Sequence, residues 1–477
     1  MQIDRTTGAM PPTKVRKKTP PTASIGDHPD GALQLVLSFL PAQDAVRTCV
    51  LARRWRHTWR SAAGLIILCG GDTRRKFADR LLRARGATPV DTCEFRLLEL
   101  EDEDVRHIDV WIRHVLQCKV HVLRINNVCI GRQPDGDQPE YEPASLPLIS
   151  QHLKKLQLLN IYTLYNGFLD FSSCPVLEDL EIRGCDLSYA DRLSSQSLKR
   201  LTIDGCDNLD VGRMKIYAPN LVSLWLQGIN IPSGCILDFS SCPVLEDLEI
   251  RGCNLLIADR LLSQSLKRLT IDGLSFFYDG ERMEICAPNL FSLWLEVYDG
   301  CTPSLQGMSS LVGAVIKLHR NDWGHVPVCS QTERSGHGCV GRNCDKYFLL
   351  HSLSEAQNLA LIAHHGEDGT RMDLEFYPTF NKLKTLLLNE YWCEPPDFSA
   401  LASLLEHSPV LEKLTLQLYS EGPKHNVEIK LSCKPMEKSA AISEHLSTVE
   451  IKCEALDERV SNVLKFLGKL NIWFQFS

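Results

Sequence analysis

The chain has 477 residues, of which 44% are hydrophobic and 23% charged, and its formal net charge is -7 with a pI near 6.1. This composition is that of a folded chain with a large apolar interior, and it excludes wholesale disorder. An acidic chain lacks the basic surface that displaces counterions from phosphates, so we expect a protein partner and no nucleic acid.

Residues 1–24 are rich in Thr, Pro and Lys and have no apolar periodicity, which predicts a flexible arm. The arm has no apolar core of signal-peptide length, and no later stretch reaches the roughly 18 apolar residues of a membrane span. We therefore expect a protein of the nucleus or cytoplasm with no membrane partner. The basic run at 14–18 is either a nuclear import patch or a plain solvated tail.

Three short helices are predicted between residue 29 and about residue 60. The first has an apolar stripe at helical spacing, formed by Leu33, Val36, Leu37 and Leu40. Pro41 breaks that helix and suits the start of a second, whose apolar face holds Ala45, Val46, Cys49 and Val50. Trp55 and Trp59 follow one turn apart. So small a unit buries little surface alone, which indicates that a partner completes its core.

The middle of the chain contains a tandem duplication. Residues 170–187 recur at 238–255 with one change, Asp186 to Asn254, and the likeness continues from 197–205 to 265–273 and from 218–221 to 287–290. Within the copies an L-x-x-L-x-L core recurs every 21 to 24 residues, beginning at Leu153, Leu177, Leu198, Leu221, Leu245, Leu266 and Leu290. Less regular cores begin at Val120, Leu383, Leu411 and Leu446. This spacing is typical of leucine-rich repeats, which stack one short parallel strand per repeat.

The predicted fold class is therefore α/β. We expect a small N-terminal three-helix unit at 25–62, followed by a leucine-rich-repeat solenoid at 90–420 with a parallel sheet on its concave face. The array holds the tandem copies near 170–228 and 238–297 and an inserted loop near 321–348, and residues 421–477 form a C-terminal region.

Residues 39–59, FLPAQDAVRTCVLARRWRHTW, closely resemble the F-box of the large plant family of F-box and leucine-rich-repeat proteins. The stretches 174–180, 397–401 and 408–416 resemble the same family, whose C-terminal extension is called the FBD domain. By this resemblance the helical unit is an F-box and 421–477 is an FBD-like region. The family normally continues into a further strand beyond the point where this chain stops, so the resemblance predicts a shortened final cap.

In that family the F-box binds a Skp-type adaptor, which links it to a cullin scaffold and a ubiquitin-charged conjugating enzyme. The resemblance implies a non-catalytic substrate-recognition subunit of an SCF-type ubiquitin ligase. The residues that would meet or support the adaptor are Pro29, Leu33, Leu37, Leu40, Pro41, Val46, Cys49, Val50 and Trp55; the alternative is that each only fills a local core. His28, where the family has Leu, and Gly31, which costs the first helix up to about 1 kcal/mol relative to Ala, predict a weaker adaptor complex.

The repeat array offers a surface for the target protein. In each strand the residues between the leucines point outward, and successive strands align them into columns on the concave face. Those predicted to bind the target are Asp179, Glu181, Arg183, Arg200, Thr202, Asp247, Glu249, Arg251, Arg268 and Thr270, with Trp225 and Trp294 as anchors. The alternatives are a solvated strand face for the charged residues and packing under a loop for the two indoles.

Other chemistry has weak signals. Residues 336–341 fit GxGxxG but follow a polar stretch instead of a hydrophobic strand, so a dinucleotide site lacks its required context. A second set has residue types that bind zinc, although its spacings match no paired-ligand knuckle: His325, Cys329, His337, Cys339 and Cys344. We expect no cofactor, and we interpret the 19 cysteines, which include no CxxC, as reduced thiols. The alternatives to a ligase receptor are a repeat scaffold without ligase activity and an enzyme that uses the loop 325–344.

Overall fold

The computed structural model describes residues 29–51, 53–128, 148–161, 168–188, 190–206, 214–229, 235–253, 258–275, 283–299, 303–319, 349–363, 378–393, 398–419, 427–433, 443–470 and 474–476. The arm, with its basic run at 14–18, and His28 lie outside the described residues, as do the inserted loop and the zinc and dinucleotide candidates within 325–344.

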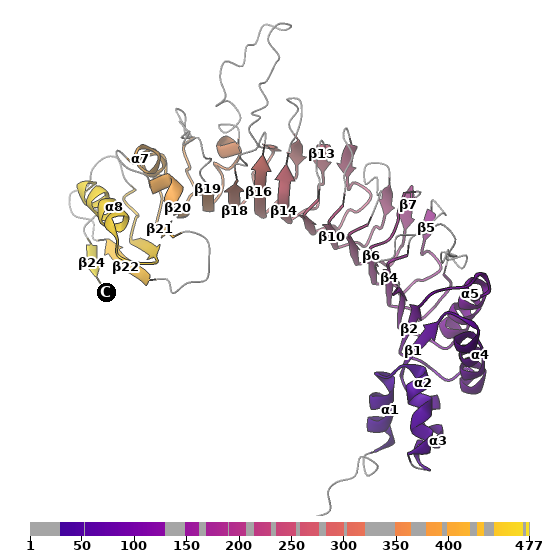
Figure 1. The fold of residues 1–477 in the computed structure, drawn as a ribbon. Helices are drawn as coiled ribbons and strands as arrows, with labels where there is room; N and C mark the ends of the chain where they lie inside the picture. The colour runs from indigo at the N-terminus through magenta and orange to yellow at the C-terminus, as the bar shows by residue number, and fades with distance from the viewer. Residues whose placement is uncertain are drawn as a thin grey trace, which may run out of the picture.

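The described chain forms an open arc whose inner side is lined by one continuous sheet (Figure 1). Its 17 strands are β1 (Gly64–Cys69), β2 (Thr92–Leu97), β3 (Val122–Asn127), β4 (Lys155–Leu159), β6 (Asp179–Arg183), β8 (Arg200–Asp204), β10 (Ser223–Gln227), β12 (Asp247–Arg251), β14 (Arg268–Ser275), β16 (Ser292–Asp299), β18 (Gly313–Leu318), β19 (Asn358–Ala363), β20 (Thr385–Asn389), β21 (Lys413–Leu418), β22 (Val427–Cys433), β23 (Thr448–Cys453) and β24 (Phe474–Phe476). Neighbouring strands pair in parallel from β1 to β21 and on to β23. Only β22, between β23 and β24, is antiparallel. The predicted fold class, with a parallel sheet on the concave face, is confirmed.

The outer side of the arc is built differently in the middle and at the ends (Figure 1). The short middle repeats return through small parallel sheets, formed by β5 (Phe168–Asp170), β7 (Arg192–Ser194) and β9 (Lys215–Tyr217), and by β11 (Cys235–Asp238), β13 (Ala258–Leu262), β15 (Glu284–Cys286) and β17 (Ser304–Gln306). Longer repeats near the ends return through helices, namely α4 (Asp72–Arg85), α5 (Asp102–Gln117), α7 (Ser399–Glu406) with the preceding turn η4 (Glu390–Cys393), and α8 (Glu458–Lys469). Repeat length therefore decides which return segment fits.

The repeat leucines form the core that the spacing predicts. All seven that begin a regular core, Leu153 to Leu290, are fully buried. The two later apolar positions of each core lie on the strand and are buried too, as in Leu180 and Ile182 of β6. Fully burying such a side chain contributes about 1.5–3 kcal/mol, and each leucine packs between those of the neighbouring repeats, so no repeat is stable alone.

The N-terminal unit is a helical trio, as predicted. It consists of α1 (Asp30–Ser38), α2 (Ala42–Arg47) with the turn η2 (Thr48–Val50), and α3 (Trp55–Thr58) with the turn η3 (Trp59–Ser61). Its small core is formed by Leu33, Leu37, Ala45, Trp55 and Ala62. The predicted stripe of α1 is only partly right, because Val36 faces outward and is 46% exposed.

The helical unit is joined to the array by buried polar contacts. Arg85, near the end of α4, donates hydrogen bonds to the backbone oxygens of Trp59 (2.7 Å) and Ala62 (2.9 Å). The Ser38 hydroxyl accepts one from the Gly64 amide at the start of β1 (2.9 Å). Burial lowers the pKa of the Arg85 guanidinium. The sheet thus begins at β1, upstream of the predicted boundary at residue 90, in a long repeat that the regular leucine spacing does not reveal.

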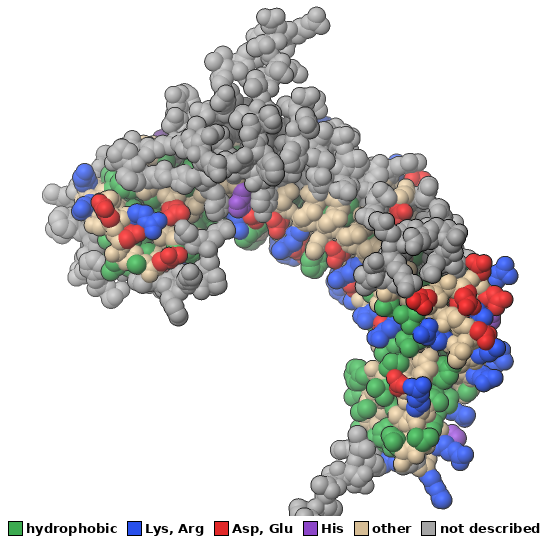
Figure 2. Space-filling view, viewed as in Figure 1, with side chains coloured by type: hydrophobic (Ala, Val, Ile, Leu, Met, Phe, Trp, Pro, Cys, Tyr) green, Lys and Arg blue, Asp and Glu red, His purple; other side chains and the backbone are tan. Residues whose placement is uncertain are grey.

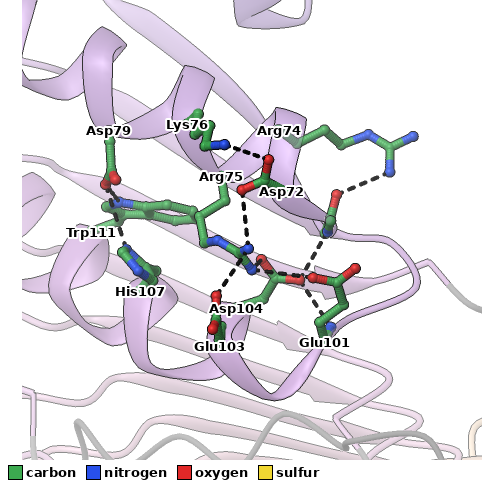
Figure 3. A network of polar contacts seen from close by, with 12 residues as sticks. Asp72, Arg74, Arg75, Lys76, Asp79, Glu101, Glu103, Asp104, His107 and Trp111 are labelled. Carbon is green, nitrogen blue, oxygen red and sulfur yellow. Dashed lines mark hydrogen bonds and ion pairs between the residues drawn. The ribbon is translucent and has the colours of Figure 1, made fainter.

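A polar network holds the first two long helices together at their N-termini (Figure 3). The Asp104 carboxylate, 0% exposed, accepts hydrogen bonds from the Gly71 and Glu101 amides, both at 2.9 Å, and from Arg75 Nη1 at 3.0 Å. Arg75 also pairs with Glu101 and Glu103. Because Asp104 caps α5 and reaches the residue before α4, it fixes the angle between the two helices.

The last strands close the array at its C-terminal end. The strand β22 turns back antiparallel on β23, and β24 pairs with β22 at Leu431 to Cys433. The helix α8 covers this end, where Phe466 stacks on Phe398 with ring centroids 4.7 Å apart. The described structure therefore includes a final strand that the sequence did not predict.

Candidate protein interaction surfaces

One exposed apolar face lies on the helical trio. Its members are large hydrophobic side chains of α1 and η2 that point to solvent: Leu35, Val36, Phe39, Val50 and Leu51, with Phe39 72% and Val50 87% exposed. Figure 2 shows hydrophobic side chains gathered at this end of the arc. We call these five residues the apolar face. Side chains of this size are normally buried, so several exposed ones on so small a helical unit point to an interaction site.

The residues predicted to meet the adaptor divide into two groups. Pro29 and Val50 are exposed, and Leu40, Pro41, Val46 and Cys49 are partly so. Leu33, Leu37 and Trp55 are buried in the local core and shape the helices without reaching a partner. Leu35, Phe39 and Leu51 are also exposed, but they were not among the residues predicted to meet the adaptor. Their positions outside the buried apolar stripe could have indicated this exposure. Contact with an adaptor stays a prediction.

The concave face carries the predicted columns of outward side chains. Strand pairing places Glu181 opposite Thr202 and Thr202 opposite Trp225, and the second copy repeats this order. We call the row that joins them the middle column; from β4 to β16 it is Gln157, Glu181, Thr202, Trp225, Glu249, Thr270 and Trp294. The structure thus brings all twelve predicted target-binding residues onto one face.

Most charges on this face are paired with one another. Arg200 forms a two-pronged ion pair with Asp179, and Arg268 forms the same pair with Asp247. The hydrogen-bonded carboxylate raises the pKa of each arginine. Charges of both signs follow the inner edge of the arc in Figure 2. Such pairing neither supports nor opposes the prediction that these residues contact a target.

Two carboxylates of the middle column are held by their own neighbours. Glu181 accepts a hydrogen bond from Gln157 at 2.5 Å and pairs with Arg183 at 2.5 Å. Glu249 pairs with Arg251 on its own strand. Its side chain is 34% exposed, whereas that of Glu181 is only 14% exposed.

The two candidate anchors are in different surroundings. Trp225 is 39% exposed. Trp294 is less exposed, and the Lys317 ammonium lies 4.9 Å from the centroid of its ring. The duplicated indoles are therefore not equivalent.

A shallow depression lies beside the concave face, at the edge where β12, β14 and β16 begin. It encloses about 580 Å³ and is lined by Val244, Glu246, Lys267 and Phe291 among others. Val244 and Phe291 are exposed there, and the first copy has Val222 where the second has Phe291.

Neither a metal centre nor a membrane-spanning helix emerges from the part of the chain that the structure describes. No group of three or more His, Cys, Asp or Glu residues in it could hold an ion. No described helix is long and apolar enough to cross a bilayer. Cys49 and Cys286 are partly exposed, whereas Cys69, Cys93, Cys393 and Cys453 are among the described cysteines that are buried. Burial raises the pKa of Cys393 to about 12.

The comparisons with known proteins identify the helical trio. Residues 25–63 match the F-box domain family, nearly the segment predicted at 25–62. The matched segment contains all five residues of the exposed apolar face described above, so the match and the geometry concern the same residues.

Several plant proteins are similar to this chain over longer stretches. An F-box/FBD/LRR-repeat protein of Arabidopsis thaliana is 24% identical over 425 residues, which cover 86% of this chain and 79% of that protein. An FBD-associated F-box protein of the same plant is 24% identical over 84% of this chain and 91% of its own length. The MEIOTIC F-BOX protein MOF of Oryza sativa subsp. japonica is 29% identical over 42% of this chain and 45% of its own length. The chain likewise spans about half the length of two further curated relatives from Arabidopsis thaliana. The predicted resemblance to plant F-box, leucine-rich-repeat and FBD proteins is confirmed.

Proposed function

We propose that the protein is the substrate-recognition subunit of an SCF-type ubiquitin ligase, acting in the nucleus or cytoplasm without a catalytic role of its own. The F-box match at 25–63 carries the proposal, because F-box domains generally bind Skp-type adaptors. The apolar face supports it, since Phe39, Val50 and Leu51 offer a partner a hydrophobic surface that the chain itself leaves uncovered.

The repeat array supplies the second half of this function. In the proposal the concave face binds a target protein and the adaptor bound at the F-box brings the ubiquitin-transfer machinery close to it, so that rate enhancement comes from proximity. The Arg85 and Ser38 contacts support this arrangement, because they fix the F-box to the first strand of the array.

A pulldown of a plant Skp-type adaptor tests the proposal. The variant Phe39→Ser, Val50→Ser, Leu51→Ser changes only exposed residues, so it should fold, and we expect adaptor capture to fall at least about tenfold because buried apolar contacts are lost. The control Val110→Ser removes another exposed hydrophobe, 59% exposed on α5, and should be captured like the intact protein. If the intact, folded protein does not capture the adaptor, the proposal of a ligase subunit is wrong.

A repeat scaffold without ligase activity is the second candidate, and Gly31 is the observation that favours it. A Cβ at Gly31 would meet no atom within 4 Å, so packing does not require a glycine that weakens α1. If weak helix formation limits adaptor binding, Gly31→Ala should strengthen capture. Capture that is absent in both proteins would favour the scaffold.

A further inference from the structure

The tandem copies place two indoles at the same position of the same column. Trp225 on β10 and Trp294 on β16 both lie in the middle column, separated by β12 and β14. At about 4.8 Å per strand, roughly 14 Å separates them along the sheet. Each follows a threonine, Thr202 or Thr270, on the preceding strand. Their surroundings differ in residue 227 or 296 on their own strands and in the strand that follows.

Trp294 is already covered by a cation of the chain itself. The next strand, β18, places Val315 beside Trp294 and Lys317 one column further. The Lys317 ammonium reaches back over the indole ring at 4.9 Å from its centroid. The carboxylate of Glu296, on the same strand as Trp294, forms an ion pair with the Lys317 ammonium at 3.6 Å. The same carboxylate lies within hydrogen-bond distance, 2.7 Å, of His319 Nε2. This is a cation–π contact supported by a carboxylate.

Trp225 has the same backbone pairing with the following strand as Trp294, but the neighbouring side chains differ. The next strand, β12, places Glu249 beside Trp225, and Arg251 occupies the position of Lys317. Glu249 binds Arg251 on its own strand, whereas Val315 cannot hold Lys317 in that way. Gln227 is at the position where the second copy has Glu296. Because Gln227 is uncharged, it does not attract Arg251 toward the ring of Trp225. Arg251 is thus held away by Glu249, and Trp225 remains 39% exposed.

We propose that Trp225 and the Glu249 carboxylate receive a lysine or arginine side chain of the target, while Trp294 is closed by Lys317. This deepens the proposed function by naming the chemistry that the concave face recognises. The contact between Lys317 and Trp294 is the precedent within the same sheet. It shows that an ammonium fits over an indole of the middle column when a carboxylate lies nearby. The 34% exposed Glu249 supplies the complementary charge beside the open ring.

Fluorine NMR on the full chain labelled with 5-fluorotryptophan tests the proposal. The resonances of the two indoles are assigned with Trp225→Phe and Trp294→Phe. The probe is the capped tripeptide Gly-Lys-Gly, and the control is capped Gly-Gln-Gly. We expect a saturable shift of the Trp225 resonance, with the lysine peptide bound about two- to fivefold more tightly, as an exposed cation–π contact gives. The Trp294 resonance should not move. Equal responses to both peptides would overturn the proposal.

Reciprocal variants make the test sharper. Lys317→Ala should open Trp294, so that its resonance responds to Gly-Lys-Gly. The double variant Gln227→Glu, Glu249→Val gives Trp225 the carboxylate and the valine that lie next to Trp294. It should close Trp225, because Arg251 becomes free to lie over the ring. Thermal unfolding checks that both variants fold. Unchanged responses in both folded variants would contradict the proposal. Adaptor capture uses the F-box alone, so a failure at Trp225 and a failure of the ligase function are distinguishable.

Discussion

In the two tandem copies, 170–228 and 238–297, the same framework contacts recur. Lys199 pairs with Glu178 at 2.8 Å and Lys267 with Glu246 at 2.7 Å. The two tryptophans nevertheless differ, because Trp225 is followed by the second copy and Trp294 by β18, which belongs to neither. Duplication therefore reproduces the framework contacts within a copy, whereas the surroundings of each tryptophan also depend on residue 227 or 296 and on the strand that comes next.

The largest expected change in stability tests whether the hydrophobic cores of the two tandem copies are equivalent. Leu180→Ala and Leu248→Ala remove matched leucines that are 1% and 2% exposed. Each should lower the free energy of unfolding by about 2–5 kcal/mol through lost transfer energy and a cavity, and the two values should agree within about 1 kcal/mol. Urea denaturation measures both. A cost below about 1 kcal/mol in one copy would show that its core is packed differently.

A smaller effect is expected in a region that has no second copy. Asp104→Asn keeps the size of the side chain but removes the charge that three donors share, and it should cost about 1–3 kcal/mol. Asp102→Asn, in the same helical turn but exposed, should change stability by less than about 0.5 kcal/mol. Equal costs for the two variants would refute a structural role for the network in Figure 3.

Loss of either duplicated ion pair, Lys199–Glu178 or Lys267–Glu246, should lower stability by a small and equal amount that depends on pH. Hydrogen bonds from Lys199 and Lys267 lower the pKa values of Glu178 and Glu246 from the usual 4.5. A carboxyl group with a lowered folded-state pKa stabilises the fold above its unfolded-state pKa, and this stability is lost as pH falls through the folded-state value. Lys199→Met and Lys267→Met should slightly lower the urea midpoint at pH 7 and leave it unchanged well below pH 4. A loss that persists in acid would contradict this origin.

The smallest effect concerns the depression at the strand edge. Phe291→Val gives the second copy the residue of the first, and because Phe291 is 54% exposed, stability should change by less than about 0.5 kcal/mol. Thermal unfolding measures the change. A loss above about 1 kcal/mol would mean that Phe291 stabilises the fold and is not free to serve a partner.

Periodicity explains which features the sequence could predict. The leucine spacing fixed the buried positions, and alternation along each strand then placed Asp179, Glu181 and Trp225 outward. The sequence could not predict that Lys317 covers Trp294 while Arg251 leaves Trp225 open, because that depends on side chains from different strands. Likewise β1 escaped prediction, since its long repeat lacks the regular spacing, and the exposure of Phe39 depends on how three short helices pack.

The hydrogen bonds of Arg85 and Ser38, which join the helical trio to the array, have a consequence for how the length of the array can change in evolution. Because each strand pairs only with its neighbours, a tandem copy such as β12, β14 and β16 can enter the sheet without disturbing either end. Each insertion of three strands lengthens the arc by roughly 14 Å. Under the proposed function, duplication within the array would change the distance between the F-box and a bound target in discrete steps of this size.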